Sequence, residues 1–419
     1  MVNKEFIPNG WRKVTIDDIC ELRRGASPRP ISDPKYFGNG AGWVRISDVT
    51  RAGNYLKQTE QYLSKLGESK SVKVTPGEVI MSICATIGRP IIVDMEACIH
   101  DGFVVFKNLS EHVNNLFFLY WLKTKENYFN SLGQQGTQKN LNTNIVKKTE
   151  ILLPPLPVQR KIAAILSSVD EAIEKTEAII EQTEKVKKGL MQQLLTKGIG
   201  HTRFKKTEIG EIPEEWEVKS ISEVAKVVSG GTPSKQVYEY WENGTIPWAT
   251  PTDITSNDNK YISTTQLMIT ESGLRNSSAN LLPEGSVLMT SRATIGSRCI
   301  NTVPMATNQG FKSFICDPDV LHNEYLYYLI DKIKDQFIAL ASGSTFLEIS
   351  KSAVETFKIP VPPLEEQIEI AKMLSSLDEK LSVEKVKKES LQTIKKGLMQ
   401  SLLTGKVRVK VDEDEVVSS

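Results

Sequence analysis

Two loops carry arginine, lysine and hydroxyl side chains beside glycine, a combination suited to contacts with phosphate groups and base edges. The first loop is LRRGASPRP at 22–30, and the second is VVSGGTPSK at 227–235. Small residues let backbone N–H groups approach a phosphate, and Arg or Lys adds positive charge. For each residue taken singly, the alternative is an ordinary solvated loop side chain. The candidates in these loops are Arg23, Arg24, Ser27, Arg29, Thr232, Ser234 and Lys235.

A second group of candidates follows two tryptophans, Trp43 and Trp248, and lies in later loops. Arginine donors suit guanine, whereas hydroxyl and carboxylate groups suit other bases. The later loops are GQQGTQKNLN at 133–142 and ASGSTFLEIS at 341–350. The candidates of this group are Arg45, Ser47, Asp48, Arg51, Gln138, Lys139, Thr250, Thr252, Asp253, Arg292 and Thr345.

Patterns for catalysis and for metal binding are missing from the sequence. It has no G-x-x-x-x-G-K-[ST] loop and no cluster with metal-ligand spacing. The Pro-Pro pairs occur as LPPL and VPPL, without the flanking residues of an amino-methyltransferase motif. His100-Asp101 could transfer a proton, but the matching pair later in the chain is Asn308-Gln309, which favours a structural role. We therefore predict no catalytic residue, no metal and no cofactor in this chain.

The composition is that of a soluble globular protein. The 419 residues are 40% hydrophobic and 25% charged, with a formal net charge of +1, so any nucleic-acid surface must come from local clusters of basic residues. Five cysteines without a C-x-x-C pair favour reduced thiols in a cytosolic protein. No run of about 18 apolar residues occurs, so we expect a cytoplasmic protein that is neither exported nor membrane-bound.

The candidate loops occur in pairs because the sequence contains an internal repeat. KKGLMQQLLT at 187–196 returns as KKGLMQSLLT at 395–404, which is 208 positions later. LLPPLPVQRKIAAILSSVD at 152–170 matches PVPPLEEQIEIAKMLSSLD at 360–378 at the same offset, while GASP and GGTP match at an offset of 205. The chain is therefore two tandem copies, roughly 10–198 and 215–405, each large enough for a domain.

The front of each copy predicts an α+β domain with a small, mostly antiparallel sheet. Short apolar runs such as 79–83, 90–94 and 103–106 alternate with turn residues and indicate strands. One aromatic-rich helix follows in each copy, at 114–132 and at 323–341. Its aromatic residues could stack on bases, but their helical spacing favours the core.

The back of each copy predicts one long helix with a heptad pattern. The expected coiled-coil seam is formed by apolar residues, namely Ile162, Leu166, Val169, Ile173, Ile180, Leu190, Leu194, Ile370, Leu374, Leu377, Leu381, Leu391, Leu398 and Leu402. Polar residues interrupt it at Thr176, Thr183, Lys187, Glu384, Lys388 and Lys395. The breaks in the second helix could set the register or mark looser packing, and the sequence leaves both open.

A helix of about 38 residues would be ~57 Å long and could not bury its stripe on a small domain alone. We therefore expect the two helices to pair antiparallel, with the two domains at opposite ends and a pseudo-twofold axis between them. Gly189 and Gly397, inside the repeated motif, would allow close approach of the partner helix or of a bound protein. The expected segments are a first domain at 1–153, a helix at 154–198, a linker at 199–214, a second domain at 215–360, a helix at 361–405 and an acidic tail at 406–419.

Two similar domains held apart with dyad symmetry match the geometry of duplex DNA, on which dimeric readers contact half-sites about one helical turn apart. The domains diverge in their loops while the helices stay alike. This predicts an asymmetric, two-part DNA target with an unread spacer. The alternatives are a coiled-coil adaptor that holds two proteins apart, and a self-contained methyltransferase or nuclease.

A strand running into P-P-L-x-x-Q, then a long helix closing on K-G-L-M-Q-x-L-L-T, twice per chain, resembles the specificity subunit of Type I restriction-modification systems. The resemblance covers residues 10–405. It implies two target recognition domains, separated by helices that form an antiparallel coiled coil. It also implies a complex with double-stranded DNA, two methyltransferase subunits and, in the full assembly, restriction and translocation subunits. S-adenosylmethionine would then be bound by the methyltransferase partners. Arg160-Lys161 stands where the second copy has Ile368-Glu369, which puts equal partner contacts in doubt.

Overall fold

The computed structural model describes residues 7–133, 140–343 and 347–411. The chain forms two compact units, which we call the first unit (residues 1–177 and 386–419) and the second unit (residues 178–385). Each unit therefore combines one predicted globular domain with one end of both long helices. The compact units therefore do not coincide with the predicted segments, because each long helix is divided between the two units.

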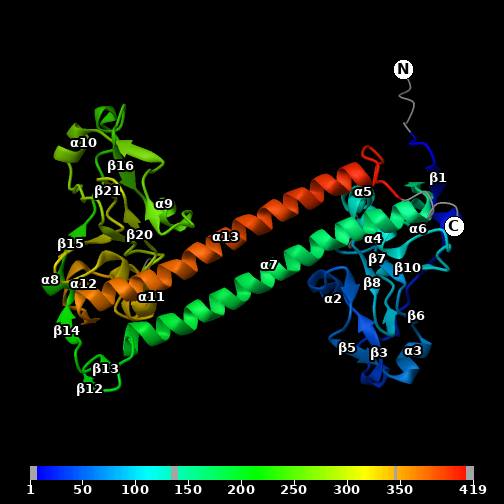
Figure 1. Ribbon diagram of the computed structural model, residues 1–419, viewed down its shortest axis with the longest axis horizontal. Coiled ribbons are helices and arrows are strands. Elements are labelled where there is room, and N and C mark those ends of the chain that lie inside the picture. The colour runs from blue at the N-terminus through cyan, green and yellow to red at the C-terminus, as the bar shows by residue number, and fades with distance from the viewer. Residues whose placement is uncertain (1–6, 134–139, 344–346, 412–419) are drawn as a thin grey trace. The chain divides into compact units, whose positions relative to one another are not determined.

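The first unit contains a five-stranded, a four-stranded and a two-stranded sheet (Figure 1). Most of their strand pairs are antiparallel. The five-stranded sheet has the order β2 (Glu21–Arg24), β10 (Phe103–Lys107), β7 (Val79–Ser82), β8 (Pro90–Val93) and β4 (Tyr55–Leu56). The four-stranded sheet has the order β5 (Gln61–Leu63), β3 (Phe37–Val44), β9 (Ala97–Ile99) and β6 (Val72–Val74). β4 runs parallel to β8, and β3 runs parallel to β9. β1 (Arg12–Thr15) pairs with β11 (Glu150–Leu153), which brings together the two ends of the domain.

Short helices connect these strands, and two further helices carry the aromatic residues of the core. The connecting helices are α1 (Ile16–Ile19), α2 (Ile46–Arg51), α3 (Lys65–Ser69) and α6 (Thr143–Lys147), with a 3-10 turn, η1 (Pro34–Tyr36). The predicted helix 114–132 consists of two helices, α4 (Asn115–Thr124) and α5 (Glu126–Leu132), which meet at Lys125. Its aromatic side chains Phe117, Phe118 and Tyr120 are fully buried, as predicted for core residues.

The second unit repeats this plan. Its five-stranded sheet has the order β15 (Ala225–Ser229), β22 (Lys312–Cys316), β19 (Val287–Met289), β20 (Arg298–Asn301) and β17 (Tyr261–Ile262). A three-stranded sheet contains β18 (Leu267–Ile269), β16 (Ile246–Ala249) and β21 (Ala306–Thr307), and β14 (Glu217–Ser220) pairs with β23 (Lys358–Val361). The helical elements are α8 (Ile221–Val224), η2 (Tyr238–Tyr240), α9 (Pro251–Thr255), α10 (Glu271–Arg275), α11 (Asn323–Ala339) and α12 (Lys351–Thr356). A hairpin of β12 (Phe204–Thr207) and β13 (Gly210–Pro213) occupies the expected linker.

The two long helices are α7 (Leu156–Lys197) and α13 (Leu364–Leu402), with 42 and 39 residues. Gly198 follows α7 directly, and Gly405 lies three residues beyond the end of α13. Their φ angles of 65° and 69° are left-handed and are tolerated best by glycine. Within the first unit Asp170 faces Lys395 and Glu177 faces Lys388, so the helices run antiparallel there. Within the second unit Lys187 faces Asp378 in the same sense.

The predicted seam residues all lie inward or at the edge of the seam. The buried members are Ile162, Leu166, Leu194, Ile370, Leu374, Leu381 and Leu402. The half-buried members are Val169, Ile173, Ile180, Leu190, Leu377, Leu391 and Leu398. The α+β class, the repeat and the long helices are therefore confirmed.

The polar interruptions of the seam are ordered contacts. Thr176 and Thr183 are buried and donate hydrogen bonds to backbone oxygens of their own helix. Lys187, Lys388 and Lys395 form ion pairs with acidic residues of the facing helix. An ion pair in a seam forms in only one alignment, so these residues favour the register reading over loose packing.

The repeated glycines do not bring helices together. A Cβ atom added to Gly189 or to Gly397 would meet no described atom within 4 Å. Of the two alternatives for these glycines, close approach of the partner helix is therefore excluded, because the positions are open. Among the described residues, no helix has both the length and the apolar character needed to cross a membrane.

Candidate nucleic-acid interface

The first candidate loop of the first unit is held by the turn that contains His100 and Asp101. Gly25 packs so closely on this turn that an added Cβ would lie 2.1 Å from the backbone oxygen of His100. Ser27 Oγ donates to Asp101 Oδ1 at 2.5 Å, and Arg29 Nη2 donates to Asp101 Oδ2 at 3.0 Å. Arg24 Nε donates to the Asp101 backbone oxygen at 2.9 Å. The motif beside His100 thus anchors the candidate loop, as the predicted structural role requires.

The second unit uses the same frame with different side chains. A Cβ added to Gly230 would lie 1.9 Å from the backbone oxygen of Asn308, which is the position equivalent to His100. Thr232 Oγ1 donates to Gln309 Oε1, as Ser27 does to Asp101. Where the first loop has Arg29, the second has Ser234, an exposed residue. The backbone geometry is shared, and the chemistry that it presents differs.

Asp48 and Asp253 cap the short helices that follow the two tryptophans. Asp48 Oδ2 accepts from the backbone N–H of Arg45 at 2.8 Å, and Asp253 Oδ2 accepts from that of Thr250 at 2.8 Å. Their second oxygens accept from the backbone N–H groups of Glu60 and Gln266. Both carboxylates are buried. Through these contacts, the two aspartates position α2 and α9.

The remaining candidates fall into two groups. In one group the side chains are engaged inside the protein: Arg51 pairs with Asp48 and Glu60, and Arg292 Nε donates to Glu348 at 2.9 Å. In the other group the side chains are exposed and make no hydrogen bond or ion pair within the described part of the chain, namely Arg23, Arg45, Ser47, Lys235 and Thr252. The open group is free to contact a ligand. Gln138, Lys139 and Thr345 lie outside the described residues.

Two anchored candidates, Ser27 and Arg29, and two open ones, Arg45 and Ser47, meet at one cavity of the first unit. Its volume is about 410 Å³, and its wall is formed by Ser27, Arg29, Ile31, Trp43, Arg45, Ile46, Ser47, His100 and Asp101. Burial alone would raise the pKa of Asp101, but the hydrogen bond from Ser27 and the charge of Arg29 bring it below its ordinary value. The carboxylate is therefore charged near neutral pH and holds Arg29 over the cavity.

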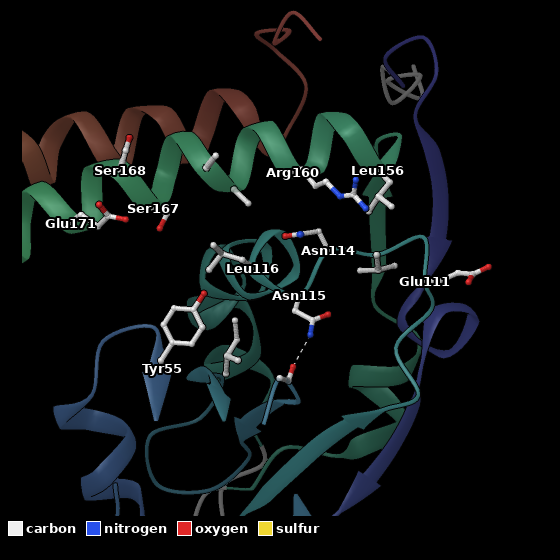
Figure 2. Close-up of a pocket in the computed structure, with 15 residues that line it drawn as sticks. Tyr55, Glu111, Asn114, Asn115, Leu116, Leu156, Arg160, Ser167, Ser168 and Glu171 are labelled. Carbon is white, nitrogen blue, oxygen red and sulfur yellow. Dashed lines mark hydrogen bonds between the residues drawn. The ribbon is translucent and has the colours of Figure 1, made fainter. Parts of the chain in front are cut away.

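A wider groove of about 720 Å³ lies between α4 and the start of α7 in the first unit. In Figure 2 Leu156 and Arg160 border it from α7, and Tyr55 and Asn115 border it from the domain. The equivalent region of the second unit carries a polar network, in which Lys260 Nζ lies 2.6 Å from Glu324 Oε2 and 2.7 Å from Ser375 Oγ. The two copies therefore differ in shape and charge beside their long helices.

Each unit also has a cluster of partly buried polar side chains that joins its domain to both helices. In the first unit Asp170 accepts hydrogen bonds from Tyr120 Oη at 2.6 Å and from Asn54 Nδ2 at 2.8 Å, and it pairs with Lys395. In the second unit Asp378 accepts from Tyr328 Oη at 2.6 Å and pairs with Lys187. Sequence reasoning placed Lys187 and Lys395 in the seam but missed the tyrosines and aspartates of these clusters. The signal was present, because Tyr120 and Tyr328, and likewise Asp170 and Asp378, obey the offset of 208.

Comparison with known proteins points to one family. Residues 8–185 and again residues 213–393 match the Type I restriction modification DNA specificity domain. The MjaVIII specificity subunit of a type I restriction enzyme from Methanocaldococcus jannaschii is 29% identical over 432 residues, which cover 96% of this chain and 94% of the relative. The MjaIX specificity subunit from the same organism is 41% identical over 195 residues, which cover 46% of this chain and 45% of the relative.

The fold is shared with a solved structure of the same kind. The crystal structure of the S subunit from a Type I restriction-modification system of M. genitalium has a TM-score of 0.60 and 16% sequence identity. The match covers 98% of this chain and 99% of that chain. At this identity the likeness concerns the fold.

Proposed function

Because the chain belongs to the family of the Type I restriction modification DNA specificity domain, we propose that each of its two units reads one half of a bipartite, asymmetric DNA target. The chain is the non-catalytic specificity subunit of such a system, and it acts with the subunits that modify and restrict DNA. The observation that carries the proposal is the shared frame with different side chains. Gly25 and Gly230 hold the same backbone, on which Arg29 and Arg45 are replaced by Ser234 and Thr250.

Two copies of a methyltransferase subunit are the partners we propose for the long helices. On α7 in the second unit, Val186 is 46% exposed and lies beside the open Gly189. On α13 in the first unit, Ile394 is 52% exposed and lies beside the open Gly397. These two patches occupy equivalent positions of the repeat, and equivalent patches suit two copies of one partner. S-adenosylmethionine would be bound by those partners, and the complex would act on DNA in the cytoplasm.

The two partner copies are expected to make unequal contacts near the starts of the helices. The groove of the first unit is bordered by Arg160, whereas Ile368 stands at the equivalent position of the second copy. A partner segment that suits an open groove bordered by Arg160, Glu111 and Glu171 does not suit an apolar surface beside the Lys260–Glu324 network. This asymmetry would orient the two partners differently on the two half-sites.

A domain exchange tests the reading function. Residues 10–150 are replaced by those of another family member, and the methylated sequence is mapped in cells that also carry the methyltransferase. We expect one half-site to change while the other half-site and the spacer stay the same. A change in both half-sites would contradict independent units, and methylation without any sequence preference would reject the proposed function.

The length of the paired helices is proposed to set the spacer. One heptad is inserted in α7 after Ile180 and one in α13 after Glu384, at the level where Glu177 faces Lys388 and Glu184 faces Lys385. Seven residues add about 10 Å, or about three base pairs. We expect a longer spacer with unchanged half-sites. An insertion in α7 alone is the control, because it breaks the register of the ion pairs and should abolish activity.

A further inference from the structure

His100 has a ring nitrogen that the turn around it does not need. Its Nδ1 accepts a hydrogen bond from the backbone N–H of Gly102 at 2.9 Å. In the second unit Asn308 Oδ1 accepts from Gly310 N–H at the same distance. The turn therefore requires only an acceptor at this position, which asparagine supplies as well as histidine. The imidazole adds Nε2 on the far side of the ring.

The Nε2 atom of His100 is a hydrogen-bond donor near neutral pH. Burial lowers the pKa of His100, so the ring is neutral there, and since Nδ1 accepts a hydrogen bond, the proton lies on Nε2. The side chain is 18% exposed and forms part of the wall of the 410 Å³ cavity. Within the described residues Nε2 has no partner.

Trp43 supplies a second donor without a partner on the same wall. Its indole N–H is buried and bonds to no described group, and its ring centre lies 5.8 Å from that of His100. The equivalent Trp248 donates to the backbone oxygen of Gly231 at 2.9 Å. A buried unpaired donor costs free energy, so its retention calls for a ligand that pairs with it. The two tryptophans therefore differ in that the indole N–H of Trp248 is paired inside the protein, whereas that of Trp43 is not.

The charges around the cavity select the class of ligand. Arg45 and Ser47 add exposed donors, while Asp101 places a half-exposed carboxylate at the rim. Arg29 pairs with that carboxylate and neutralises it. The neutral donors of His100 and Trp43 suit an uncharged group with two acceptors, and the major-groove edge of guanine presents two, O6 and N7. We propose that this cavity of the first unit receives the major-groove edge of a guanine, with His100 as a specificity-determining donor and Trp43 as a second donor. This assignment rests on the proposed function, since it names one base that the first unit reads.

The variant His100→Asn tests the assignment without disturbing the turn, because the second unit already uses asparagine there. The full chain with its methyltransferase subunits is titrated with duplexes that carry the methylated sequence found in cells, and with the set of single base-pair changes in the first half-site. We expect His100→Asn to lower the affinity for the intact target about tenfold and to remove the preference at one G·C pair. Preferences in the second half-site should not move. The matched control is Asn308→His, which should leave the first half-site unaffected.

Trp43→Phe is the second variant, because phenylalanine keeps an aromatic ring at this buried position and removes the indole N–H together with the five-membered ring that carries it. Its fold should be retained, and it should weaken the preference at the same base pair as His100→Asn. Wild-type affinity and base preference in both variants would overturn the assignment and leave His100 as a turn residue. Equal weakening on every duplex, with a smaller salt dependence, would also overturn it in favour of a phosphate contact. Failure of the proposed function looks different, because the wild-type complex itself would then show no sequence preference.

Discussion

Lys395, near the end of α13, forms an ion pair with Asp170 of α7 inside the first unit. The equivalent lysine of the first repeat, Lys187, pairs with Asp378 inside the second unit. In both copies, the first lysine of the repeated KKGLM motif therefore pairs with an aspartate on the long helix of the other copy. Tyr120 and Tyr328 donate to the same two carboxylates, so each pair is tied to a domain as well as to a helix.

Removal of the lysine should destabilise the first unit. In Lys395→Met the Asp170 carboxylate, whose side chain is 12% exposed, keeps only neutral donors. We expect a loss of about 2–3 kcal/mol in the free energy of unfolding, measured with urea. The control is Lys388→Met, whose pair with Glu177 is more exposed, with 33% and 48% of the two side chains accessible, and is worth less than about 1 kcal/mol. Equal losses of unfolding free energy in the two variants would show that the pair with Asp170 contributes no more to stability than the pair with Glu177.

Alkaline pH should stabilise the first unit through Lys123. Burial, with the nearby charge of Lys395, lowers the pKa of Lys123 to about 8. Between that value and its ordinary pKa of about 10.5, the unfolded chain binds more protons than the folded chain, so stability rises with pH. The gain should be about 1–3 kcal/mol between pH 7 and pH 10. Lys123→Met should flatten this rise in urea unfolding curves, and an identical slope in both proteins would refute the assignment.

The glutamine of the P-P-L-x-x-Q motif should be required for folding of its unit. Gln159 is fully buried, donates to the backbone oxygens of His112 and Pro154, and accepts from the N–H of Asn114, all at 2.8 Å. Gln159→Ala leaves these groups unpaired, which should cost about 3 kcal/mol. Gln367→Ala should cost as much in the second unit. Thermal unfolding with one probe in each unit measures the two effects separately.

Open and engaged arginines should differ in their effect on DNA binding. Arg23→Gln removes an exposed charge and should lower affinity while reducing the slope of log affinity against log salt by about 1. Arg292→Gln should leave both quantities unchanged, because its guanidinium is occupied by Glu348. The measurement is a series of DNA titrations at several salt concentrations. An equal loss in both variants would mean that engaged residues also reach DNA.

Alanine at the open glycines should separate stability from partner binding. Nothing lies within 4 Å of a Cβ at Gly189, so Gly189→Ala should stabilise the chain alone by about 0.5–1 kcal/mol. The same methyl group should weaken binding of the methyltransferase subunit if that subunit packs there. Gln392→Ala, at an exposed position of α13, is the control and should leave partner binding intact. Unchanged partner affinity in both Gly189→Ala and Gly397→Ala would move the docking surface elsewhere.

The repeat and the heptads predicted the architecture because both depend on regular spacing. The seam leucines and the glycine stops at Gly198 and Gly405 could be placed from the sequence alone. The site was harder, because a loop arginine looks the same in sequence whether it faces solvent or an acidic neighbour. Arg292 and Glu348 lie 56 residues apart, and no local pattern links them. Likewise, the capping roles of Asp48 and Asp253 depend on backbone geometry that their residue type does not reveal.

The composition of the two units also fixes an order of completion during synthesis. The second unit is a continuous stretch from 178 to 385, whereas the first unit needs its residues beyond 385. Leu402 and Leu403 belong to the same core as Ile16 and Phe117. Ile16 emerges from the ribosome almost 400 residues before them, and Phe117 close to 300 residues before them. The core of the first domain therefore receives its last two buried residues only after the second unit has been translated completely. The N-terminal domain usually folds first during synthesis, and here the N-terminal unit is the last to be completed.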